Sequence, residues 1–266
     1  MEACSRYTPD MTGLRARVRA EITNEIKRLA REQLAAVGAP NLSLRAIARD
    51  LEMASSAIYR YFPTRDDLLT ALLVDAYDGL GAAAEEADTT ARGAGGRTRF
   101  ATVAHAARRW AVEHPAEWGL LYGTPVPGYA APDDTIGPAS RFGIVLLGIL
   151  ADAERDGLRV PPQRRASAGA VHRDLQRLAE GGGFAVDPEL LAIGIHLWIG
   201  VVGTIGFLLH GHLHNVIDDH DAFWASTVDQ LGDELFGPED GSTGGRRTRT
   251  TAAGARVVAG NRSRGA

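Results

Sequence analysis

The chain has 266 residues, of which 45% are apolar, so it can form one large or two modest domains with a sizeable core. Its net charge of −4 argues against a protein that binds a polyanion over its whole surface. The charge is uneven, however. Residues 1–75 carry 11 Lys and Arg against 10 Asp and Glu, and residues 241–266 carry six Arg and no acidic residue. A nucleic-acid partner should therefore meet the ends of the chain rather than its acidic middle.

The N-terminal part of the sequence predicts a flexible arm followed by a helix. Residues 1–13 contain few apolar side chains and are expected to lack fixed structure. From residue 14 to residue 37 apolar side chains recur every three to four residues, which is typical of an amphipathic helix. Gly38 and Pro40 then end the helix. Cys4 is the only cysteine, so the chain cannot form an intrachain disulfide, and we expect a reducing, cytoplasmic location.

Two short helices follow, joined by a tight break. Ser43 is a suitable N-cap for a helix whose apolar stripe has the spacing i, i+3, i+4, i+7. The stripe consists of Leu44, Ile47, Ala48 and Leu51. Residues 52–54 break this helix, and Ser55 or Ser56 caps a second one that ends before Pro63. Two short helices with a tight turn are typical of a helix-turn-helix, which presents its second helix to a DNA major groove.

The next predicted helix connects this motif to the rest of the chain. Thr64 is its expected N-cap, and Asp66 and Asp67 lie in its first turn, where negative charge is favourable. Leucines then continue the apolar pattern to about residue 88. We therefore assign residues 14–87 to a DNA-binding domain of three helices with a connecting helix.

Residues 88–237 predict a larger helical body. A polar loop is expected at 88–98, a helix at 100–113, a short helix from Pro115, and a proline-rich loop at 124–134. Further helices are predicted at 138–156 and 218–236. The intervening apolar run, 190–213, contains no Asp, Glu, Lys or Arg. Residues 159–187 give a weaker helical pattern, with a break at Gly181–Gly183, and residues 238–266 are expected to be a disordered, Arg-rich tail.

The motif residues at 44–69 resemble the DNA-binding domain of the TetR family of transcriptional regulators. The resemblance rests on Leu44-Arg45-Ala46-Ile47-Ala48, Ala57-Ile58-Tyr59-Arg60-Tyr61-Phe62 and Pro63-Thr64-Arg65-Asp66-Asp67-Leu68-Leu69. The family usually has glycine and a small apolar residue in the turn, where this chain has Glu52 and Met53. It usually has Ser or Thr where Ala54 stands, and lysine where Arg65 stands.

The second half resembles the WHG-type C-terminal domain found in some TetR regulators. The matching residues are His114-Pro115, the run from Tyr122 to Tyr129, and Trp198, Gly203, Gly211, His212 and Leu213, which are expected to share one helix. Val202 replaces the histidine that gives the type its name, so no role of that histidine is carried over. Together the two resemblances cover about residues 14–236.

The resemblance implies DNA contacts around the second short helix. It implies that the Tyr59 and Tyr61 hydroxyls and the Arg65 cation contact backbone phosphates, although one tyrosine could instead be a packing residue. Arg45 has the chemistry to pair with guanine, and a solvated or phosphate-facing role is an equal alternative. The full set of predicted DNA-binding residues is Ser43, Arg45, Ser55, Ser56, Ala57, Tyr59, Tyr61, Thr64 and Arg65.

Other charged side chains and the body histidines have simpler interpretations. Arg15, Arg17 and Arg19 could reach phosphate or the minor groove, and a solvated helix face is the favoured interpretation. His210 and His214 are spaced i, i+4, so on a helix they would share one face and could bind a metal ion. Because they form only one such pair and no cysteine is near them, ordinary histidines at a helix end or an interface are the favoured interpretation. We therefore predict no metal and no cofactor.

Two further features of the body have competing interpretations. The apolar run at 190–213 is long enough to span a membrane, but its histidines and glycines favour a buried dimer helix. Candidate walls of an apolar ligand pocket are aromatic residues that would serve equally well as core residues. They are Trp110, Trp118, Tyr122, Phe142, Trp198 and Phe207.

The sequence thus predicts an all-α homodimeric transcription regulator. It is expected to repress by binding a near-palindromic site on double-stranded DNA and to release that site when a small apolar effector binds the body. One rival is an all-α enzyme or ligand carrier without DNA function, although no catalytic arrangement can be named. Another is an architectural DNA binder without effector control.

Overall fold

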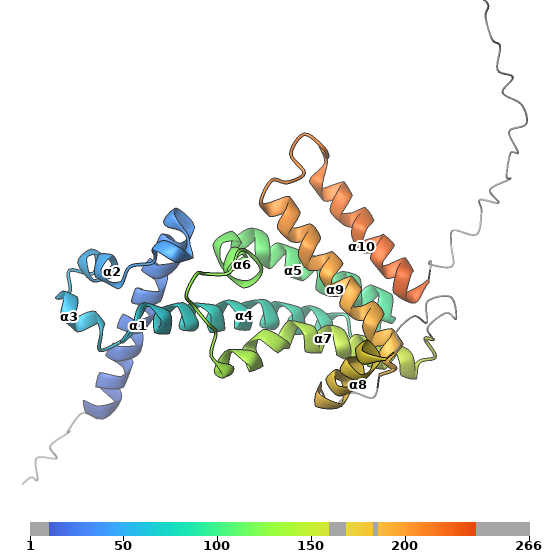
Figure 1. Ribbon diagram of the computed structural model, residues 1–266, viewed down its shortest axis with the longest axis horizontal. Helices are drawn as coiled ribbons and strands as arrows, with labels where there is room; N and C mark the ends of the chain where they lie inside the picture. Colours follow the sequence, from blue (N-terminus) through green and yellow to red (C-terminus); the bar gives the residue numbers. More distant parts are fainter. Residues whose placement is uncertain (1–10, 160–168, 183–185, 238–266) are drawn as a thin grey trace, which may run out of the picture.

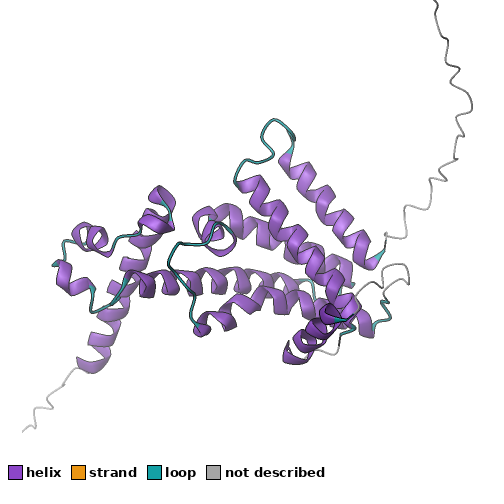
Figure 2. Cartoon of the chain, in the orientation of Figure 1, coloured by secondary structure: helices purple, strands orange, loops and turns teal. Residues whose placement is uncertain are grey.

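The computed structural model describes residues 11–159, 169–182 and 186–237, and these are all-helical, with no strand (Figure 2). The predicted all-α fold class is confirmed. The predicted Arg-rich tail and most of the predicted N-terminal arm lie outside the described residues. The remaining residues of that arm, 11–13, form the start of the first helix rather than a flexible segment.

The N-terminal domain consists of three helices and the start of a fourth. The three helices are α1 (Met11–Val37), α2 (Leu44–Asp50) and α3 (Ser55–Ile58), with the 3-10 turn η1 (Ala39–Asn41) between α1 and α2, and the fourth is α4 (Arg65–Thr90). Their apolar stripes meet in a closed core, in which Ile26, Ile47, Ile58 and Leu68 are completely buried. Two helices as short as α2 and α3 are not stable alone in water, so this shared core is what fixes their geometry.

Helix α4 (Arg65–Thr90) is common to both parts of the molecule (Figure 1). Its first turns contribute Leu68, Leu69 and Leu72 to the N-terminal core, whereas Leu80 and Ala84 lie in the core of the body. A capping box fixes its start. The Thr64 hydroxyl accepts a hydrogen bond from the backbone N–H of Asp67, and the Asp67 carboxylate accepts one from the backbone N–H of Thr64.

The body packs along the rest of α4. Its elements are α5 (Gly96–Glu113), α6 (Pro115–Tyr122), η2 (Asp133–Thr135), α7 (Ile136–Arg155), α8 (Ala170–Gly182), α9 (Pro188–Leu209) and α10 (His220–Phe236). Helices α5 and α7 lie along α4, α10 packs on α5 and α9, and α8 packs on α9 (Figure 1). Trp118 and Trp224, both fully or almost fully buried, are the largest core side chains.

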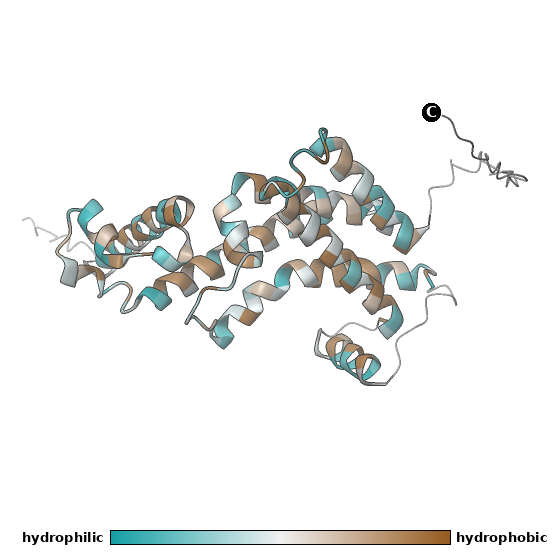
Figure 3. Cartoon of the chain, turned by 45° about the horizontal axis from the view of Figure 1, so that its top comes forward, coloured by the Kyte–Doolittle hydropathy of each residue, from teal (hydrophilic) through white to brown (hydrophobic). Residues whose placement is uncertain are grey.

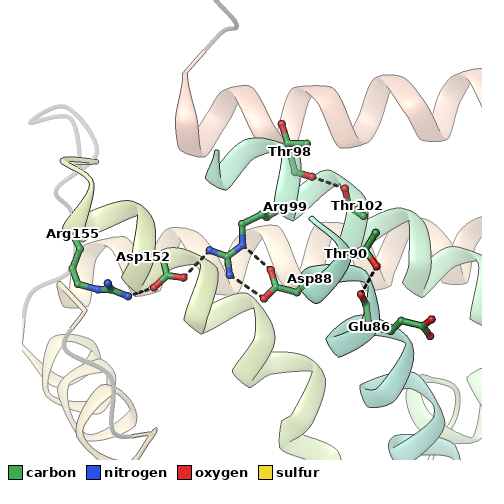
Figure 4. A network of polar contacts seen from close by, with 8 residues as sticks. All are labelled: Glu86, Asp88, Thr90, Thr98, Arg99, Thr102, Asp152 and Arg155. Carbon is green, nitrogen blue, oxygen red and sulfur yellow. Dashed lines mark hydrogen bonds and ion pairs between the residues drawn. The ribbon is translucent and has the colours of Figure 1, made fainter. Parts of the chain in front are cut away.

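Two ion-pair clusters hold the body to α4. At its far end, the largely buried guanidinium of Arg99 on α5 donates to both oxygens of Asp88 on α4, at 2.7 and 2.9 Å, and to Asp152 on α7 at 2.7 Å (Figure 4). In the middle of α4, Arg141 of α7 pairs with Asp78 at 2.6 Å and with Glu85 at 2.7 Å. The two arginines therefore tie three helices together.

A third set of contacts joins the N-terminal domain to the body. Asp75 of α4 accepts from Lys27 at 2.9 Å and from Arg31 at 2.6 Å, and Arg31 also faces Glu117 of α6 at 3.6 Å. The loop after α6 crosses back to the same junction, where the Tyr129 hydroxyl lies 2.8 Å from that of Thr70. Movement of α6 or of this loop is thereby coupled to α1 and α4.

Several predicted boundaries were wrong. Helix α4 extends to Thr90 and α5 begins at Gly96, so the loop predicted at 88–98 is shorter. Gly181 and Gly182 lie inside α8 rather than in a break, while Gly183 is outside the described residues.

The helix predicted over the apolar run 190–213 also ends earlier than predicted. Helix α9 stops at Leu209, because Gly211 adopts a φ of 71° and the His212 N–H bonds back to the Phe207 carbonyl. His212 and Leu213 therefore do not share a helix with Trp198. The last helix begins at His220, two residues later than predicted, with Asp219 as its N-cap.

Two segments are long and apolar enough to cross a membrane by length and composition, namely 133–155 and 188–209. Both form part of the body core along one face, for example through Ile149 of α7 and through Val201 and Ile205 of α9. Helix α9 still leaves much of its remaining surface exposed, including Ile199 and Phe207.

Candidate nucleic-acid interface

Helix α2 and the turn that follows it set the position of the second helix. The Ser43 hydroxyl accepts from the Ala46 N–H at 3.3 Å, and the Ser43 N–H donates to the Gln33 side chain. At the other end, the Met53 N–H bonds to the Ala48 carbonyl at 2.8 Å, which places Glu52 in the left-handed region with a φ of 54°. Glu52 thus holds the conformation for which glycine is better suited.

The start of α3 faces solvent. Ser55 and Ser56 are exposed and Ala57 is half-buried, whereas the next residue, Ile58, is completely buried. Hydrogen bonds from the Tyr61 and Phe62 N–H groups to the Ile58 carbonyl continue the helical path by one turn. The predicted opening of the recognition helix is therefore a small, polar, accessible surface on a rigid base.

The two predicted phosphate-contacting tyrosines have different environments. Tyr59 is 39% exposed, as expected for a hydroxyl that contacts a ligand. Tyr61 is half-buried, and the guanidinium of Arg19 lies 5.1 Å from its ring centroid. Arg19 also donates to the Arg60 carbonyl at 2.8 Å. Arg19 therefore fixes the end of the recognition segment to α1, a role that helical spacing alone did not indicate.

Arg65 occupies the start of α4, where its backbone is held by the Thr64 capping box. Its Nη2 donates to the Ala39 carbonyl at 2.8 Å, its Nη1 lies 3.6 Å from Asp66, and its Nε is buried without a hydrogen-bond partner in the structure. The side chain is about one-third exposed. Part of its hydrogen-bonding capacity is thus used within the domain, and the predicted phosphate contact has to come from the exposed part.

Arg45 is a cation of the motif whose side chain is not used in polar contacts within the domain. It is exposed on α2, and its side chain forms no ion pair or hydrogen bond with any described residue. Arg60 is likewise exposed, between the two tyrosines, and was not singled out from the sequence. Arg49, by contrast, lies 4.0 Å from Asp50. Arg45 and Arg60 therefore provide free positive charge on either side of the exposed start of α3.

The predicted pocket aromatics separate into core and surface residues. Trp110, Trp118 and Phe142 are buried in the body core, and Phe207 is 55% exposed. Tyr122 contacts both Trp118 and Trp198, with ring centroids 4.7 and 6.3 Å apart, and burial raises the pKa of its hydroxyl. Trp198 lines a groove between α7, α8 and α9, which the other five do not line.

The histidines near the end of α9 do not share a helical face. His210 is the C-cap and His214 lies beyond the turn at Gly211, so the predicted i, i+4 arrangement was wrong. Among the described residues, no group of three or more His, Cys, Asp and Glu side chains could hold a metal ion.

Comparison with known proteins identifies both halves of the chain. Residues 26–72 match the family profile described as bacterial regulatory proteins, tetR family, and residues 100–231 match the tetracyclin repressor-like C-terminal domain. The first match contains α2, the turn and α3, and the second spans α5 to most of α10.

Relatives cover most of the chain. The HTH-type transcriptional regulator Rv1816 of Mycobacterium tuberculosis is 42% identical over 205 residues, which are 75% of this chain and 85% of the relative. A crystal structure described as that of a regulatory protein, SCO4313, has a TM-score of 0.67 at 32% identity and covers 84% of this chain and 98% of that one. A Rhodococcus sp. RHA1 protein of unknown function shares the fold, with a TM-score of 0.60 at 20% identity and coverage of 88% and 99%. The chain belongs to the TetR family of transcriptional regulators, a DNA-binding and non-enzymatic family.

Proposed function

We propose that this regulator is a homodimeric repressor that binds a near-palindromic operator and leaves it when a small apolar effector binds the body. The observation that carries the DNA-binding part is the exposed start of α3, flanked by the unpaired Arg45 and by the exposed Tyr59. Tyr59, Tyr61, Thr64 and Arg65 would contact phosphates and set the register. Arg45 would read a base edge, because Ser55, Ser56 and Ala57 offer few direct hydrogen bonds.

The dimer is supported by the surface of α9. His196, Ile199, Gly203 and Phe207 are all exposed and recur at helical spacing along one face without any formal charge. An uncharged stripe of this kind is expected to be covered by a second copy, with α9 and α10 of both subunits forming a four-helix interface. A two-fold axis would then place two α3 helices in successive major grooves, roughly 34–36 Å apart.

Effector control is supported by the contacts between body and N-terminal domain. Helix α6 reaches α1 through Glu117 and Arg31, and Tyr129 reaches Thr70 on α4. A ligand that favours a different arrangement of the body would change the spacing of the two recognition helices. Ligand and operator would then weaken each other reciprocally. This proposal also includes a WHG-type body and a cytoplasmic location. It includes no membrane association and no cofactor.

The experiment that tests this function is a selection of bound fragments from genomic DNA with the purified full-length protein, followed by affinity measurements on the selected site. We expect near-palindromic sites. Failure to enrich any sequence, with weak binding to all DNA, would favour the architectural rival. No salt-dependent DNA affinity at all would favour the ligand carrier.

Two substitutions separate sequence reading from phosphate contact. We expect Arg45→Ala to reduce the preference for the selected site by about 1–3 kcal/mol, because a base contact is lost. Arg65→Ala should weaken binding to all sequences and reduce the slope of log affinity against log salt by about one. Arg65→Lys should keep that slope, and Arg155→Ala, at the distal end of α7, is the matched control. Equal effects of Arg45→Ala and Arg65→Ala on selected and random DNA would contradict the division of roles.

The Arg-rich tail is tested by removing it. Deletion of residues 241–266 should lower affinity for random DNA at low salt while leaving the preference for the selected site unchanged, because the tail would add only sequence-independent attraction. Unchanged binding to random DNA at low salt would exclude this contribution.

A further inference from the structure

The body contains a large groove between α7, α8 and α9. Its volume is about 650 Å³, within the range of small-molecule sites. The α7 wall presents Ile136, Ser140, Gly143 and Leu147 at the spacing i, i+4, i+7, i+11, so one continuous helical face lines the groove. The opposite wall comes from α8, and α9 closes the base. Figure 3 shows α9 as a largely apolar helix, whereas α8 carries both apolar and hydrophilic residues.

The groove lining is almost entirely apolar, and it gathers large side chains that remain exposed. Ile136 is 63% exposed, Leu178 51% and Ile144 44%, and all three line the groove. They come from two helices that face each other across it. Exposed apolar side chains converging on one concavity indicate a site whose occupant supplies the missing apolar contacts.

This groove is separate from the face of α9 assigned to the dimer. Leu191, Gly194, Ile195 and Trp198 line the groove. At 100° per residue, their mean direction lies roughly a third of a turn from that of the exposed stripe, although Ile195 and Ile199, one turn apart, are neighbours at the border. A partner subunit seated on that stripe would therefore leave most of the groove open.

Among the described residues, one charged side chain lines the groove, Arg177 of α8. Its guanidinium is 77% exposed, and its ion-pair partner is Asp174, also exposed, one turn earlier on the same helix. A surface pair of this kind contributes little to stability, so a carboxylate from a ligand can replace Asp174 at low cost. The remaining polar side chain of the lining is the Ser140 hydroxyl.

We infer that this groove binds an amphiphile with a flexible apolar chain and a carboxylate head. The chain would lie against the α7 and α9 walls, and the head would pair with Arg177 at the edge. The inference deepens the proposed function, on which its regulatory part rests, by naming the effector site and the chemical class of the effector.

The groove is connected to the DNA-binding domain through α7 and α4. Arg141 follows directly after the groove residue Ser140 and pairs with Asp78 and Glu85 of α4. Packing there is tight, because a Cβ at Gly81 of α4 would lie 2.7 Å from the Cβ of Arg141. A ligand that displaces α7 would therefore displace α4, whose first turns belong to the N-terminal core.

The test is calorimetric titration of the full-length protein with dodecanoate, 1-dodecanol and dodecylamine, all below their micellar concentrations. We expect dodecanoate to bind one site per subunit, more tightly than dodecanol, and dodecylamine to bind most weakly. Arg177→Ala should weaken dodecanoate binding roughly five-fold without changing dodecanol binding. Arg173→Ala, on the same helix but outside the groove, is the matched control.

A blocking variant tests the location. A Cβ at Gly143 meets no atom within 4 Å, so Gly143→Leu fills the groove without disturbing the fold and should reduce dodecanoate binding at least roughly ten-fold. Gly137→Leu is the control, because Gly137 also lies on α7 in open space but does not line the groove. Undiminished binding to Gly143→Leu, or equal binding of the anionic and cationic amphiphiles, would overturn the inference.

Operator binding is measured separately with the same variants. Dodecanoate should release the wild-type protein from operator DNA but should not release the Gly143→Leu variant. If dodecanoate binds the groove and the operator complex survives, the site stands and its regulatory role is overturned. If the unliganded protein binds no operator, the proposed function fails while the calorimetric result on the groove is unaffected.

Discussion

The N-terminal domain and the body differ in how completely one subunit buries its apolar surface. In the N-terminal domain the apolar stripes of all four contributing helices meet inside, and Ile26, Ile47 and Ile58 have no exposed surface. In the body, Ile199 and Phe207 of α9 are more than half exposed, and Leu178 of α8 is equally open. Apart from Leu14, Val18 and Val37 of α1, no large aliphatic side chain described in the N-terminal domain is exposed, whereas the body has apolar surfaces that a partner or a ligand could cover.

This difference reflects what each region has to do. A DNA-reading helix must be held in one geometry, which a closed core and a capping box supply. A region that pairs with a copy of itself and responds to a ligand, as we propose for the body, must instead keep apolar surface available. The difference can be tested by changes that act on one region and leave the other intact.

The largest expected effect comes from placing a charge on the open face of α9. Gly203→Glu should raise the dimer dissociation constant at least about 100-fold, roughly 3 kcal/mol, because two carboxylates would be buried at the two-fold interface. Within one subunit the change is harmless, since a Cβ at Gly203 meets no atom within 4 Å and glutamate is a better helix former than glycine. Sedimentation velocity over a concentration series measures the effect.

Gly137→Glu is the control for Gly203→Glu, because it adds the same charge to an exposed and open position on α7. It should leave the oligomeric state unchanged. A Gly203→Glu protein that stays dimeric at the lowest concentrations would show that this face of α9 is not the interface.

The helices of the N-terminal domain were predicted from the sequence more accurately than those of the body. The N-cap residues Ser43 and Thr64 and the stop at Pro63 are local signals, so α2, α3 and α4 could be placed closely. In the body, the end of α9 depends on Gly211 adopting a positive φ, which an uninterrupted apolar run conceals. Gly181 and Gly182 of α8 were mistaken for a break, because glycine adopts helical and non-helical backbone almost equally readily and the local sequence does not decide between them.

The candidate site shows the same division. Ser55, Ser56 and Tyr59 are exposed, and their contact with DNA stays a prediction from the motif. The contacts of Arg19 with Tyr61 and of Arg65 with Ala39 join residues far apart in the chain, so local spacing could not indicate them. The groove lining could not be assigned either, because it combines one face from each of three helices.

The next largest effect concerns the polar contacts that hold the body to α4. Arg99→Ala should reduce the free energy of unfolding by about 2 kcal/mol, because it leaves Asp88, whose side chain is 14% exposed, without its partner. Chemical denaturation at fixed protein concentration measures this. Arg28→Ala is the control, since its pairs with Glu25 and Glu32 are exposed and should contribute nothing measurable. Equal losses in the two variants would contradict the buried-cluster interpretation.

A smaller and opposite effect is expected at the turn of the N-terminal domain. Glu52→Gly should stabilise the protein by about 0.5 kcal/mol, because relief of the left-handed strain at a φ of 54° exceeds the added freedom of the unfolded chain. Glu52→Ala removes the same carboxylate but keeps the Cβ, so it should give no gain. Thermal unfolding of the three proteins, compared at one pH, distinguishes strain from charge. A gain in both variants would assign the effect to the carboxylate.

The smallest effect is a pH dependence in the body, at the contact between α5 and α10. The Trp224 indole N–H donates to His105 Nδ1 at 2.9 Å, so the imidazole must be neutral at Nδ1 for this bond to form. Burial, together with the nearby Arg108 and Arg109, lowers the pKa of His105. A base with a lowered folded-state pKa contributes stability that is fully present above its unfolded value, near 6.5, and is lost as pH falls from there toward the folded value.

Unfolding free energies measured between neutral and mildly acidic pH should therefore decline more for the wild type than for His105→Gln. Glutamine can accept the indole hydrogen bond through its carbonyl but does not titrate, so it removes the pH term while keeping the contact. His196→Gln is the matched control, because His196 is exposed on α9 and bonds only to the Ala192 carbonyl of its own helix. A decline of equal size in His105→Gln would have to arise from other titratable groups, such as carboxylates or the remaining histidines of the body, and would remove His105 as its cause.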